Sequence, residues 1–389
     1  MRPQRVKTPI THFGTSGHIH YEPKGTGLIF SAWNYPILLA LGPLVSAIAA
    51  GCTAILKPSE QAPASSAWLA ALIADCFSPE EVAVVEGDAE VAQHLTALPF
   101  DHLLFTGSPG VGKLVMRAAA EHLTSVTLEL GGKSPCIVTT SANLDAAARK
   151  IAFGKFTNAG QTCICPDYLL VDRTIADDFV RRLSHAIGTV YGSTPTARQT
   201  TDGYARIIHE RHFDRLLALL TDATEAGAHL AFGGQHDRDQ LYLAPTLLTD
   251  VPLDSNLMQE EIFGPLMPIL TYDTLDDALA LINSRPKPLA FYIFTDDDAE
   301  ADRVVHHTTA GSTVINDTLL HFAHTELPFG GVGTSGMGKA HGHHGFLAFS
   351  NERAVLKQQW AHPLYHRLGP PITDQAKQLL RATLRLLRR

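Results

Sequence analysis

Cysteine is scarce in this chain, and its scarcity limits the classes of protein that the sequence can encode. Five cysteines occur among 389 residues, at Cys52, Cys76, Cys136, Cys163 and Cys165. They are too few and too irregularly spaced for a disulfide framework of the kind that secreted domains use. A reducing compartment fits this usage best, so we expect a cytoplasmic protein.

The chain also lacks an excess of positive charge. Its net charge is −8, whereas a nucleic-acid interface needs a basic face. The charged N-terminus MRPQRVKTPITHF is not followed by an apolar core and is not a signal peptide. Residues 26–56 are uncharged and long enough to span a bilayer, but Pro36, Gly42-Pro43 and Gly51 divide them. These spacings are typical of strand, turn, helix and strand. We therefore expect neither a nucleic-acid partner nor a membrane span.

Length and patterning favour an α/β protein of two domains, because 389 residues exceed one compact core. In the first third, short apolar runs alternate with helical patterns. The expected strands are residues 27–33, 53–57, 82–87, 102–107 and 125–130, and the expected helices include 64–77 and 111–123. This alternation predicts a doubly wound parallel sheet that binds ligands at the carboxyl ends of its strands.

The alternation begins again after Gly131–Lys133, where we place a domain boundary. Further strands are expected at 136–140, 168–172, 289–296 and 312–317, and helices at 144–156 and 275–285. The glycine-rich segment 329–338 closes this second domain. Residues 373–389 predict a basic amphipathic helix with Leu380, Leu384 and Leu387 on one face.

The segment FTGSPGVGK, residues 105–113, follows one of these strands and opens a helix. Free amides and the helix dipole make such a position an anion site, and Pro109 suits the first helical turn. Its G-x-x-G-x-G spacing differs from the dinucleotide fingerprint G-x-G-x-x-G, and a Walker lysine pattern is absent. By itself the segment leaves a ligand loop and an ordinary tight turn both open.

Two acidic positions compete for contact with a ribose. Glu129 lies about twenty residues beyond the loop at a strand end, where a Rossmann domain places its ribose-binding acid. Lys57 and Glu60 in ILKPSE also follow a strand. Physical reasoning alone does not choose between them, and each is equally compatible with a solvated loop charge.

The segment NAGQTCICPDY, residues 158–168, places Cys163 and Cys165 two positions apart. A catalytic cysteine needs a lowered pKa or a nearby base, which the turn before Cys163 and a following amide cluster favour. A zinc site would need two further ligands, and C-x-C without a second pair is poor evidence for one. Histidines such as those in AHGHHG (340–345) are more typical of surface loops, so we expect no metal. A nucleophile and an inert core cysteine both remain open.

Together these segments resemble the aldehyde dehydrogenase superfamily. The matching stretches are WNYP (33–36), LKPSE (56–60), FTGS (105–108), LELGGKSP (128–135), GQTC (160–163), QEEIFGP (259–265) and LPFGGVGTSGMG (327–338). They occur in the family's order over nearly the whole chain. Three segments resemble the class 3 branch of the superfamily, and coniferyl aldehyde dehydrogenases in particular. They are GQTCICPDY, NDTLLH (316–321) and SGMGKAHGHHGF (335–346).

The resemblance implies a role for each matching residue. Cys163 corresponds to the nucleophile, Glu129 to the general base and Asn34 to the oxyanion donor. The implied cofactor-binding residues are Trp33, Lys57, Glu60, Gly107, Ser108, Gly112, Glu261 and Phe263. Among these, Lys57 and Glu60 correspond to the adenosine-ribose contacts, Ser108 and its loop to the pyrophosphate contact, and Glu261 and Phe263 to the nicotinamide-ribose contacts.

The resemblance also implies a domain organisation and a homodimer. It places an NAD(P)-binding domain at 23–131, a catalytic domain at 132–347, oligomerisation strands at 5–22 and 348–359, and a basic tail at 360–389. The tail is expected to pack on the partner subunit rather than on a membrane surface.

The implied activity is oxidation of an aldehyde, either aromatic such as coniferyl aldehyde or medium-chain aliphatic, to the carboxylic acid. A thioester on Cys163 would be hydrolysed by water that Glu129 activates. Glu60 favours NAD over NADP, because a carboxylate repels the 2′-phosphate. The alternatives are a CoA-acylating relative, against which Glu129 argues, and a catalytically silent truncated homologue.

The sequence departs from the family's pattern at two places. It begins just before the WNYP strand, so we expect a helical segment of the family's cofactor domain to be missing and an apolar face to be exposed. Cys165 stands where the class 3 pattern has alanine.

Overall fold

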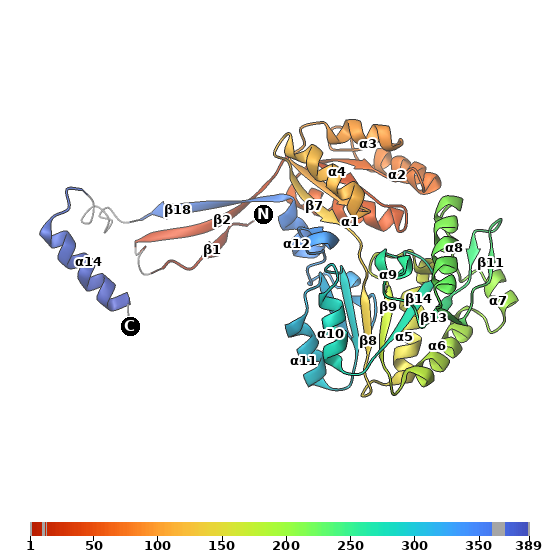
Figure 1. Cartoon of the computed structure of the whole chain (residues 1–389). Coiled ribbons are helices and arrows are strands. Elements are labelled where there is room, and N and C mark those ends of the chain that lie inside the picture. The colour runs from red at the N-terminus through yellow and green to blue at the C-terminus, as the bar shows by residue number, and fades with distance from the viewer. Residues whose placement is uncertain (1, 10–11, 13, 360–369, 388–389) are drawn as a thin grey trace. The chain divides into compact units, whose positions relative to one another are not determined.

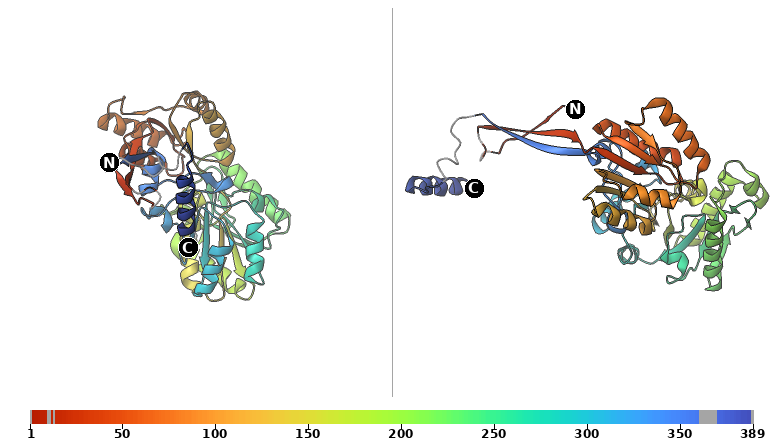
Figure 2. Two further views of the ribbon diagram at one scale, coloured as in Figure 1. Left: turned by 90° about the vertical axis from the view of Figure 1, so that its left-hand side faces the viewer. Right: turned by 90° about the horizontal axis from the view of Figure 1, so that it is seen from above.

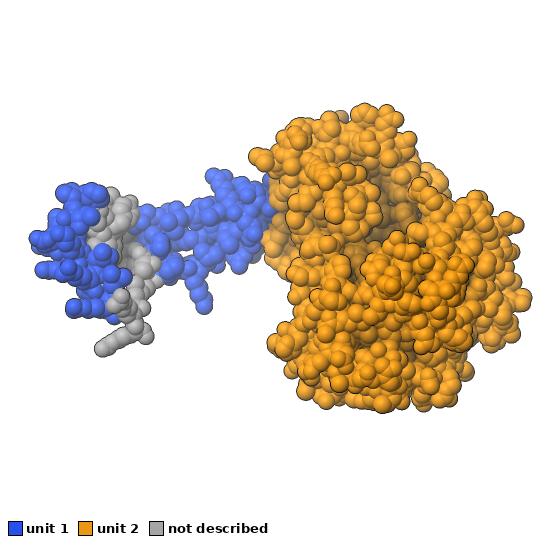
Figure 3. Space-filling view, in the orientation of Figure 1, with its two compact units in different colours: residues 1–23, 350–389 blue, residues 24–349 orange. Residues whose placement is uncertain are grey.

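The computed structural model describes residues 2–9, 12, 14–359 and 370–387. The chain divides into two compact units (Figure 3), which are described separately. The larger unit comprises residues 24–349, and the smaller unit draws on residues 1–23 and 350–389.

The first part of the larger unit forms a six-stranded sheet with the order β17-β7-β6-β3-β4-β5. Strand β7 of this sheet is labelled in Figure 1. Its strands are β3 (Thr26–Phe30), β4 (Thr53–Lys57), β5 (Val82–Val84), β6 (His102–Thr106), β7 (Ser125–Glu129) and β17 (Gly336–Met337). All pairs are parallel except β17 with β7. The predicted doubly wound parallel sheet is therefore confirmed.

Both faces of this sheet are covered, which explains the continuous apolar runs of its strands. Successive side chains point to opposite faces, so Leu28 and Phe30 pack in one apolar cluster and Ile29 in another. The helices of this part are α1 (Pro36–Ala50), α2 (Pro63–Cys76), α3 (Ala89–Thr96) and α4 (Pro109–Ala120).

The uncharged stretch 26–56 folds as strand, helix and strand, as its proline and glycine positions predict. Helix α1 begins at Pro36 and ends at Gly51, whose φ of 86° is a left-handed conformation that glycine adopts without strain. Within the described ranges, none of the helices has the length and apolarity needed to cross a membrane.

The second part of the larger unit forms a seven-stranded sheet with the order β10-β13-β14-β9-β8-β15-β16. Its strands are β8 (Pro135–Val138), β9 (Tyr168–Asp172), β10 (His229–Phe232), β13 (Thr246–Thr249), β14 (Leu266–Tyr272), β15 (Ala290–Phe294) and β16 (Ser312–Ile315). Only the edge strand β10 runs antiparallel to its neighbour. A small hairpin of β11 (His236–Asp237) and β12 (Tyr242–Leu243) accompanies it.

The helices of this second part cover a large apolar core. They are α5 (Leu144–Phe156), α6 (Ala176–Tyr191), α7 (Pro195–Thr200), α8 (Glu210–Glu225), α9 (Asn256–Gln259), α10 (Leu275–Asn283) and α11 (Asp298–His307). Helix α12 (Gly342–Ala348) instead packs against α1 and the apolar cluster of the first part. Short 3-10 turns lie at Thr157–Gly160, Leu320–Ala323 and Gly333–Ser335. The bounds of α5, β9 and β4 coincide with the predicted ones, and the other predicted elements differ by a few residues at their ends.

The smaller unit contains a three-stranded antiparallel sheet, which Figure 2 shows in two further views. Its strands are β1 (Gln4–Val6), β2 (Thr15–Pro23) and β18 (Ser350–Gln358), with β2 in the middle. An ion pair between Arg353 and Glu22 at 2.9 Å joins β18 to β2. Helix α14 (Asp374–Leu387) forms where an amphipathic helix was predicted, while residues 360–369 and 388–389 of the predicted tail lie outside the described residues.

Candidate active site

Three loops meet at the carboxyl ends of β3, β6 and β7. The chain goes from β3 to β4 and β5 on one side, then returns to place β6 and β7 on the other side. The order of the sheet therefore reverses between β3 and β6, and ligands bind at such a reversal in open α/β sheets. Trp33 and Asn34 follow β3, Ser108 follows β6, and Glu129 ends β7.

The second sheet contributes two more loops, and these lie at the amino ends of its strands. Cys163 precedes β9, and Glu261 with Phe263 precedes β14. Strands β9 and β14 are parallel neighbours, with Leu169 opposite Ile269, so the loops that enter them lie at the same edge of the sheet. This pairing brings the glutamate loop beside the cysteine loop.

The cysteine loop has an unusual backbone. After α5, residues Asn158, Ala159 and Gly160 have φ values of 52°, 52° and 73°, which are left-handed. Gly160 is required there, because a Cβ atom would lie 2.3 Å from the carbonyl oxygen of Gly264. A turn then follows in which the N–H of Cys165 donates to the carbonyl of Thr162 at 3.0 Å.

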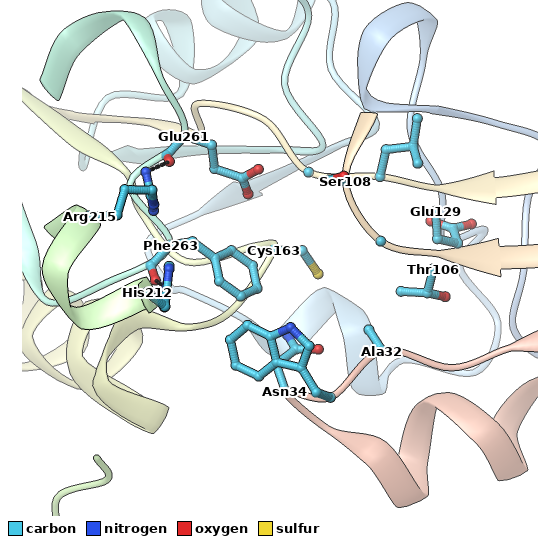
Figure 4. A pocket seen from close by; sticks show the side chains of 14 residues that line it. Ala32, Asn34, Thr106, Ser108, Glu129, Cys163, His212, Arg215, Glu261 and Phe263 are labelled. Atoms are coloured by element: carbon cyan, nitrogen blue, oxygen red, sulfur yellow. Dashed lines mark hydrogen bonds between the residues drawn. The ribbon is translucent and has the colours of Figure 1, made fainter. Parts of the chain in front are cut away.

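These loops enclose a single pocket of about 270 Å³ (Figure 4). Its lining residues are Ala32, Trp33, Asn34, Thr106, Gly107, Ser108, Glu129, Leu130, Gly131, Cys163, His212, Arg215, Glu261 and Phe263. Figure 4 shows Cys163 near the middle of this view, with Glu129 on one side and Glu261 on the other. The three residues expected to be catalytic therefore line one cavity.

Asn34 is held beside the cysteine loop by a hydrogen bond. Its Nδ2 donates to the carbonyl of Gln161 at 3.0 Å, and Asn158 Nδ2 donates to the Asn34 carbonyl at 3.0 Å. An amide nitrogen carries two hydrogens, so one N–H of Asn34 fixes the side chain and the other remains for an oxygen in the pocket.

The thiol of Cys163 is partly exposed to the pocket and is surrounded by groups that disfavour its ionisation. Burial raises the pKa of this thiol well above its usual range, and the carboxylates of Glu261 and Glu129 raise it further. Cys163 is therefore a neutral thiol in this state, and it needs a proton acceptor before it can attack.

Glu129 is an isolated buried carboxyl group. The residue is 7% exposed, and neither of its side-chain oxygens has a hydrogen-bond partner among the described residues. Burial raises its pKa well above the ordinary value, and Lys339 opposes that shift. Burial thus favours the neutral acid and makes the carboxylate, where it forms, a stronger base.

Glu261 resembles Glu129 in its electrostatics. Burial raises the pKa of Glu261 to about 8, and Asp167 raises it as well, while the backbone N–H of Gly132 lowers it. Two carboxyl groups with raised pKa values thus flank the cysteine, a combination that is typical of a functional site.

Two pocket residues with ionisable side chains, His212 and Arg215, were not found by sequence reasoning. Arg215 on α8 donates to the carbonyls of Glu261 and Ile262, and His212 Nε2 lies 2.8 Å from the carbonyl of Phe263. The His212 ring also stands edge-on to the Trp33 and Phe263 rings at 5.9 and 6.2 Å. Their spacing of three residues on one helix face is ordinary, so the sequence carries no signal that separates them from surface residues.

Three predicted cofactor residues lie outside this pocket. Lys57 is buried at the end of β4, where its Nζ donates to the Pro58 carbonyl at 2.8 Å and lies 3.6 Å from Glu60. Gly112 is buried in α4, where a Cβ atom would lie 2.8 Å from Leu130 Cδ2. Trp33, Gly107, Ser108, Glu261 and Phe263, by contrast, all line the pocket.

Helix α4 begins as the sequence predicts. Ser108 is its N-cap, whose Oγ accepts from the N–H of Val111 at 3.4 Å, and Pro109 is its first residue. The first turn of α4 thus begins beside Ser108 at the pocket wall, and the free amides of a helix N-terminus are of the kind that suits an anion.

Cys165 does not share the cavity with Cys163. It is 4% exposed and is absent from the pocket lining. Its Sγ donates to the carbonyl of Gly160 at 3.3 Å and lies 4.0 Å from Nζ of the fully buried Lys155. Within the described ranges, histidine, cysteine and acidic side chains form no group of three that could hold a metal ion.

Comparison with known proteins identifies the family. The model of the aldehyde dehydrogenase family matches residues 3–355. The 4,4′-diaponeurosporen-aldehyde dehydrogenase of Staphylococcus aureus is 48% identical over 353 residues, which are 91% of this chain and 76% of that protein. A protein of Pseudomonas aeruginosa named probable coniferyl aldehyde dehydrogenase is 48% identical over 361 residues, covering 92% of this chain and 74% of that one.

A solved structure agrees with these relatives. The substrate-bound state of Staphylococcus aureus AldH matches with a TM-score of 0.91 and 44% identity, over 98% of this chain and 82% of that chain. The sequence motifs, the two parallel sheets and these matches together show that the chain is an enzyme of the aldehyde dehydrogenase family.

Proposed function

We propose that this aldehyde dehydrogenase oxidises its substrate through a thioester on Cys163. The observation that carries the proposal is the grouping of Cys163, Asn34 and Glu129 around one cavity. A thiol is a competent nucleophile once it loses its proton. Glu129 and Glu261 line the same cavity, and in its carboxylate form each could accept that proton. Burial raises the pKa of both groups, which makes each carboxylate a stronger base.

The oxyanion that forms on attack would be stabilised by two donors. The backbone N–H of Cys163 and the second N–H of the Asn34 amide are the proposed pair, and the bond from Asn34 to Gln161 fixes the amide in advance. After the thioester forms, Glu129 would take a proton from water and direct the resulting nucleophile to the acyl carbon. Water attack releases the carboxylic acid and returns the thiol.

The residues present fit a dinucleotide cofactor. Gly107 approaches the Phe105 ring so closely that a Cβ atom would lie 2.6 Å from it, and space beside Gly110 is open. The N-terminus of α4 suits a pyrophosphate, while Glu261 and Phe263 border the same pocket as Cys163 and suit the nicotinamide ribose. NAD(P)+, when bound, accepts the hydride that leaves the adduct carbon.

The proposed cofactor preference rests on Glu60 and the proposed substrate on two relatives. The Glu60 side chain is 43% exposed at 3.6 Å from Lys57, so its carboxylate is available to a ribose and disfavours a 2′-phosphate. One of these relatives is named for 4,4′-diaponeurosporen-aldehyde and the other for coniferyl aldehyde. We propose NAD as the cofactor, with NADP as the alternative, and an aromatic or medium-chain aldehyde as the substrate.

We carry the domain assignment into this proposal as well. Residues 23–131 would bind the cofactor, residues 132–347 would supply the nucleophile, and the strands within 5–22 and 348–359 would join two subunits. Leu356 on the edge strand β18 is 65% exposed. An exposed leucine on an edge strand suits an interface that a second subunit would cover. Sedimentation velocity should give a mass of twice the 42.1 kDa chain, and a monomer would contradict the homodimer.

One experiment tests the proposed function directly. Initial rates of NAD and NADP reduction are measured over a panel of aromatic and aliphatic aldehydes, with and without CoA. We expect reduction of NAD to exceed that of NADP and the carboxylic acid to form without CoA. A product that forms only with CoA would show an acylating enzyme, and the absence of any reduction would show a silent homologue.

Cys165→Ala should keep near-normal turnover. The Cys165 thiol is 4% exposed and does not line the pocket, so it cannot reach a substrate there. Burial raises the pKa of this thiol to about 11, and Lys155 opposes the shift. Steady-state rates and the rate of inactivation by peroxide are measured for the parent and the variant. Similar inactivation would show that Cys165 serves packing, faster irreversible loss in the variant would show that it protects Cys163, and collapsed turnover without oxidant would contradict our assignment of the pair.

A further inference from the structure

The surroundings of Glu129 contain one cation that no motif accounts for. Glu129 ends β7 and lies opposite Gly336 of β17, and Lys339 follows just beyond the next pair, Met337 with Leu128. The titratable groups that face Glu129 are Lys339 from this segment and Cys163 from the cysteine loop. Glu261, His212 and Arg215 line the far part of the same pocket. Lys339 is therefore the positively charged group whose field acts on the carboxyl.

Contacts of Lys339 fix its side chain beside Glu129. Nζ of Lys339 donates to the carbonyl of Gly330 at 2.5 Å and to that of Gly331 at 3.3 Å. A Cβ atom at Gly330 would lie 2.9 Å from Glu129 Oε1 and 3.1 Å from Lys339 Cδ. The carboxyl group and the lysine side chain therefore lie against the same face of Gly330.

The hydrogen-bond capacity of the two groups is complementary. An ammonium group has three N–H donors, and two of those on Lys339 are used by the Gly330 and Gly331 carbonyls. Among the described residues, no carboxylate lies within ion-pair distance of Lys339, and both oxygens of Glu129 lack a donor. The third N–H is thus available for a water that could bridge Lys339 and Glu129, since the two side chains form no direct hydrogen bond.

We propose that Lys339 is a positioning residue that keeps Glu129 ionised for thioester hydrolysis. The proposal rests on the function proposed above, in which Glu129 activates the hydrolytic water. Burial favours the neutral acid, which cannot accept a proton, whereas the nearby ammonium favours the carboxylate. Lys339 thereby extends the pH range over which Glu129 acts as a base, and its two hydrogen bonds fix the Gly330 and Gly331 carbonyls of the glycine-rich segment.

The direction of the expected pH effect follows from charge. Because Lys339 lowers the pKa of Glu129, its removal raises that pKa, and the base becomes protonated at a higher pH. In the parent, the deacylation rate should fall at low pH as Glu129 becomes protonated, and we call this fall the acid limb. Without Lys339 the acid limb should move to higher pH by about one unit, which is the lower end of the range of pKa shifts that an adjacent opposite charge causes. Below that limb, deacylation should slow by about tenfold, and well above it the rate should be unchanged.

The test uses single-turnover kinetics of the full chain with NAD and an aldehyde over a range of pH. The burst of reduced cofactor reports acylation, and the later decay of the thioester, followed by intact mass, reports deacylation. Lys339→Met removes charge and hydrogen bonds, whereas Lys339→Gln removes the charge but keeps a donor for the carbonyls. Lys339→Arg is the conservative rescue. Lys287→Met is the matched control, because Lys287 is exposed and its Cδ is 4.0 Å from the Cβ position of Gly333 in the same glycine-rich segment.

The proposal is supported if the acid limb of deacylation shifts in Lys339→Met and Lys339→Gln while both variants keep the burst. Lys339→Arg and Lys287→Met should keep the pH profile of the parent. An unshifted limb in Lys339→Gln would overturn the proposal, as would an equal loss of burst and deacylation at every pH, which indicates a structural role alone. The underlying function is tested separately by the parent enzyme: if its thioester does not decay by hydrolysis, the proposed function fails whatever Lys339 does.

Discussion

We expect Cys163→Ala to abolish aldehyde-dependent reduction of NAD(P)+, with a residual rate below about one thousandth of the parent rate. The reason is that no other thiol reaches the pocket. Of the remaining four cysteines, Cys165 and Cys136 are buried in the core, and none of the four lines the cavity. Alanine at this partly exposed position removes the sulfur and leaves the rest of the loop in place, so folding should be preserved.

The measurement is the initial rate of NAD reduction by purified variant and parent at equal concentrations. The variant should still bind the cofactor, because Trp33, Glu261 and Ser108 are untouched. Cofactor binding is measured by the quenching of protein fluorescence. Cys136→Ala is the matched control, since it removes a thiol of the same chain at a fully buried site. Retention of more than a few per cent of the activity in Cys163→Ala would remove Cys163 from its proposed role.

The strands of this fold could be predicted because buried parallel strands leave a simple pattern. Residues 53–57 and 168–172 are apolar runs bounded by polar or turn residues, and the structure has strands with those bounds. The expected strand 27–33 ends instead at Phe30, because the chain then leaves the sheet to carry Trp33 and Asn34 into the pocket. Apolar character alone does not distinguish a strand residue from an apolar pocket residue.

The site was less predictable, because its members come from distant segments. Spacing alone left Glu129 as either a ribose ligand or a base, and that choice depends on which strand end faces the cysteine loop. The structure places Glu129 in one cavity with Cys163. His212 and Arg215 reach the same cavity from α8 through contacts with the loop before β14. Such contacts between segments about fifty residues apart leave no local pattern in a single sequence.

Lys339 illustrates the same limit at a finer scale. In the sequence it is one charged residue in a glycine-rich segment, and its neighbours are small residues that carry no signal of a carboxyl nearby. Only the return of the chain beside β7, with Gly336 opposite Glu129, brings it to the buried acid. The family resemblance supplied the base but could not supply the residue that tunes it.

Glu129→Gln should separate the two halves of the reaction. Glutamine keeps the shape of the side chain but cannot accept a proton from water, so the thioester should form and then persist. We expect a burst of reduced cofactor close to one per active site, followed by a steady-state rate lower by about a hundredfold or more, the usual contribution of a general base. The burst is measured by stopped-flow absorbance, and the stalled acyl-enzyme by intact mass mapped to Cys163.

The variant also tests the raised pKa of Glu129. In the parent, deacylation should fall as the pH drops through that pKa, because the protonated carboxyl cannot act as a base. In Glu129→Gln the residual deacylation should lose this dependence and rise only with hydroxide concentration. Glu121→Gln is the matched control, because it makes the same substitution at an exposed helix end. Gln61→Glu is not suitable as a control, because it adds a charge near the proposed cofactor site. An equal loss of the burst and of the steady-state rate in Glu129→Gln would show that Glu129 serves hydride transfer or cofactor binding. Hydrolysis would then need another base. Glu261, a carboxyl group of the same pocket with a raised pKa, would be the candidate.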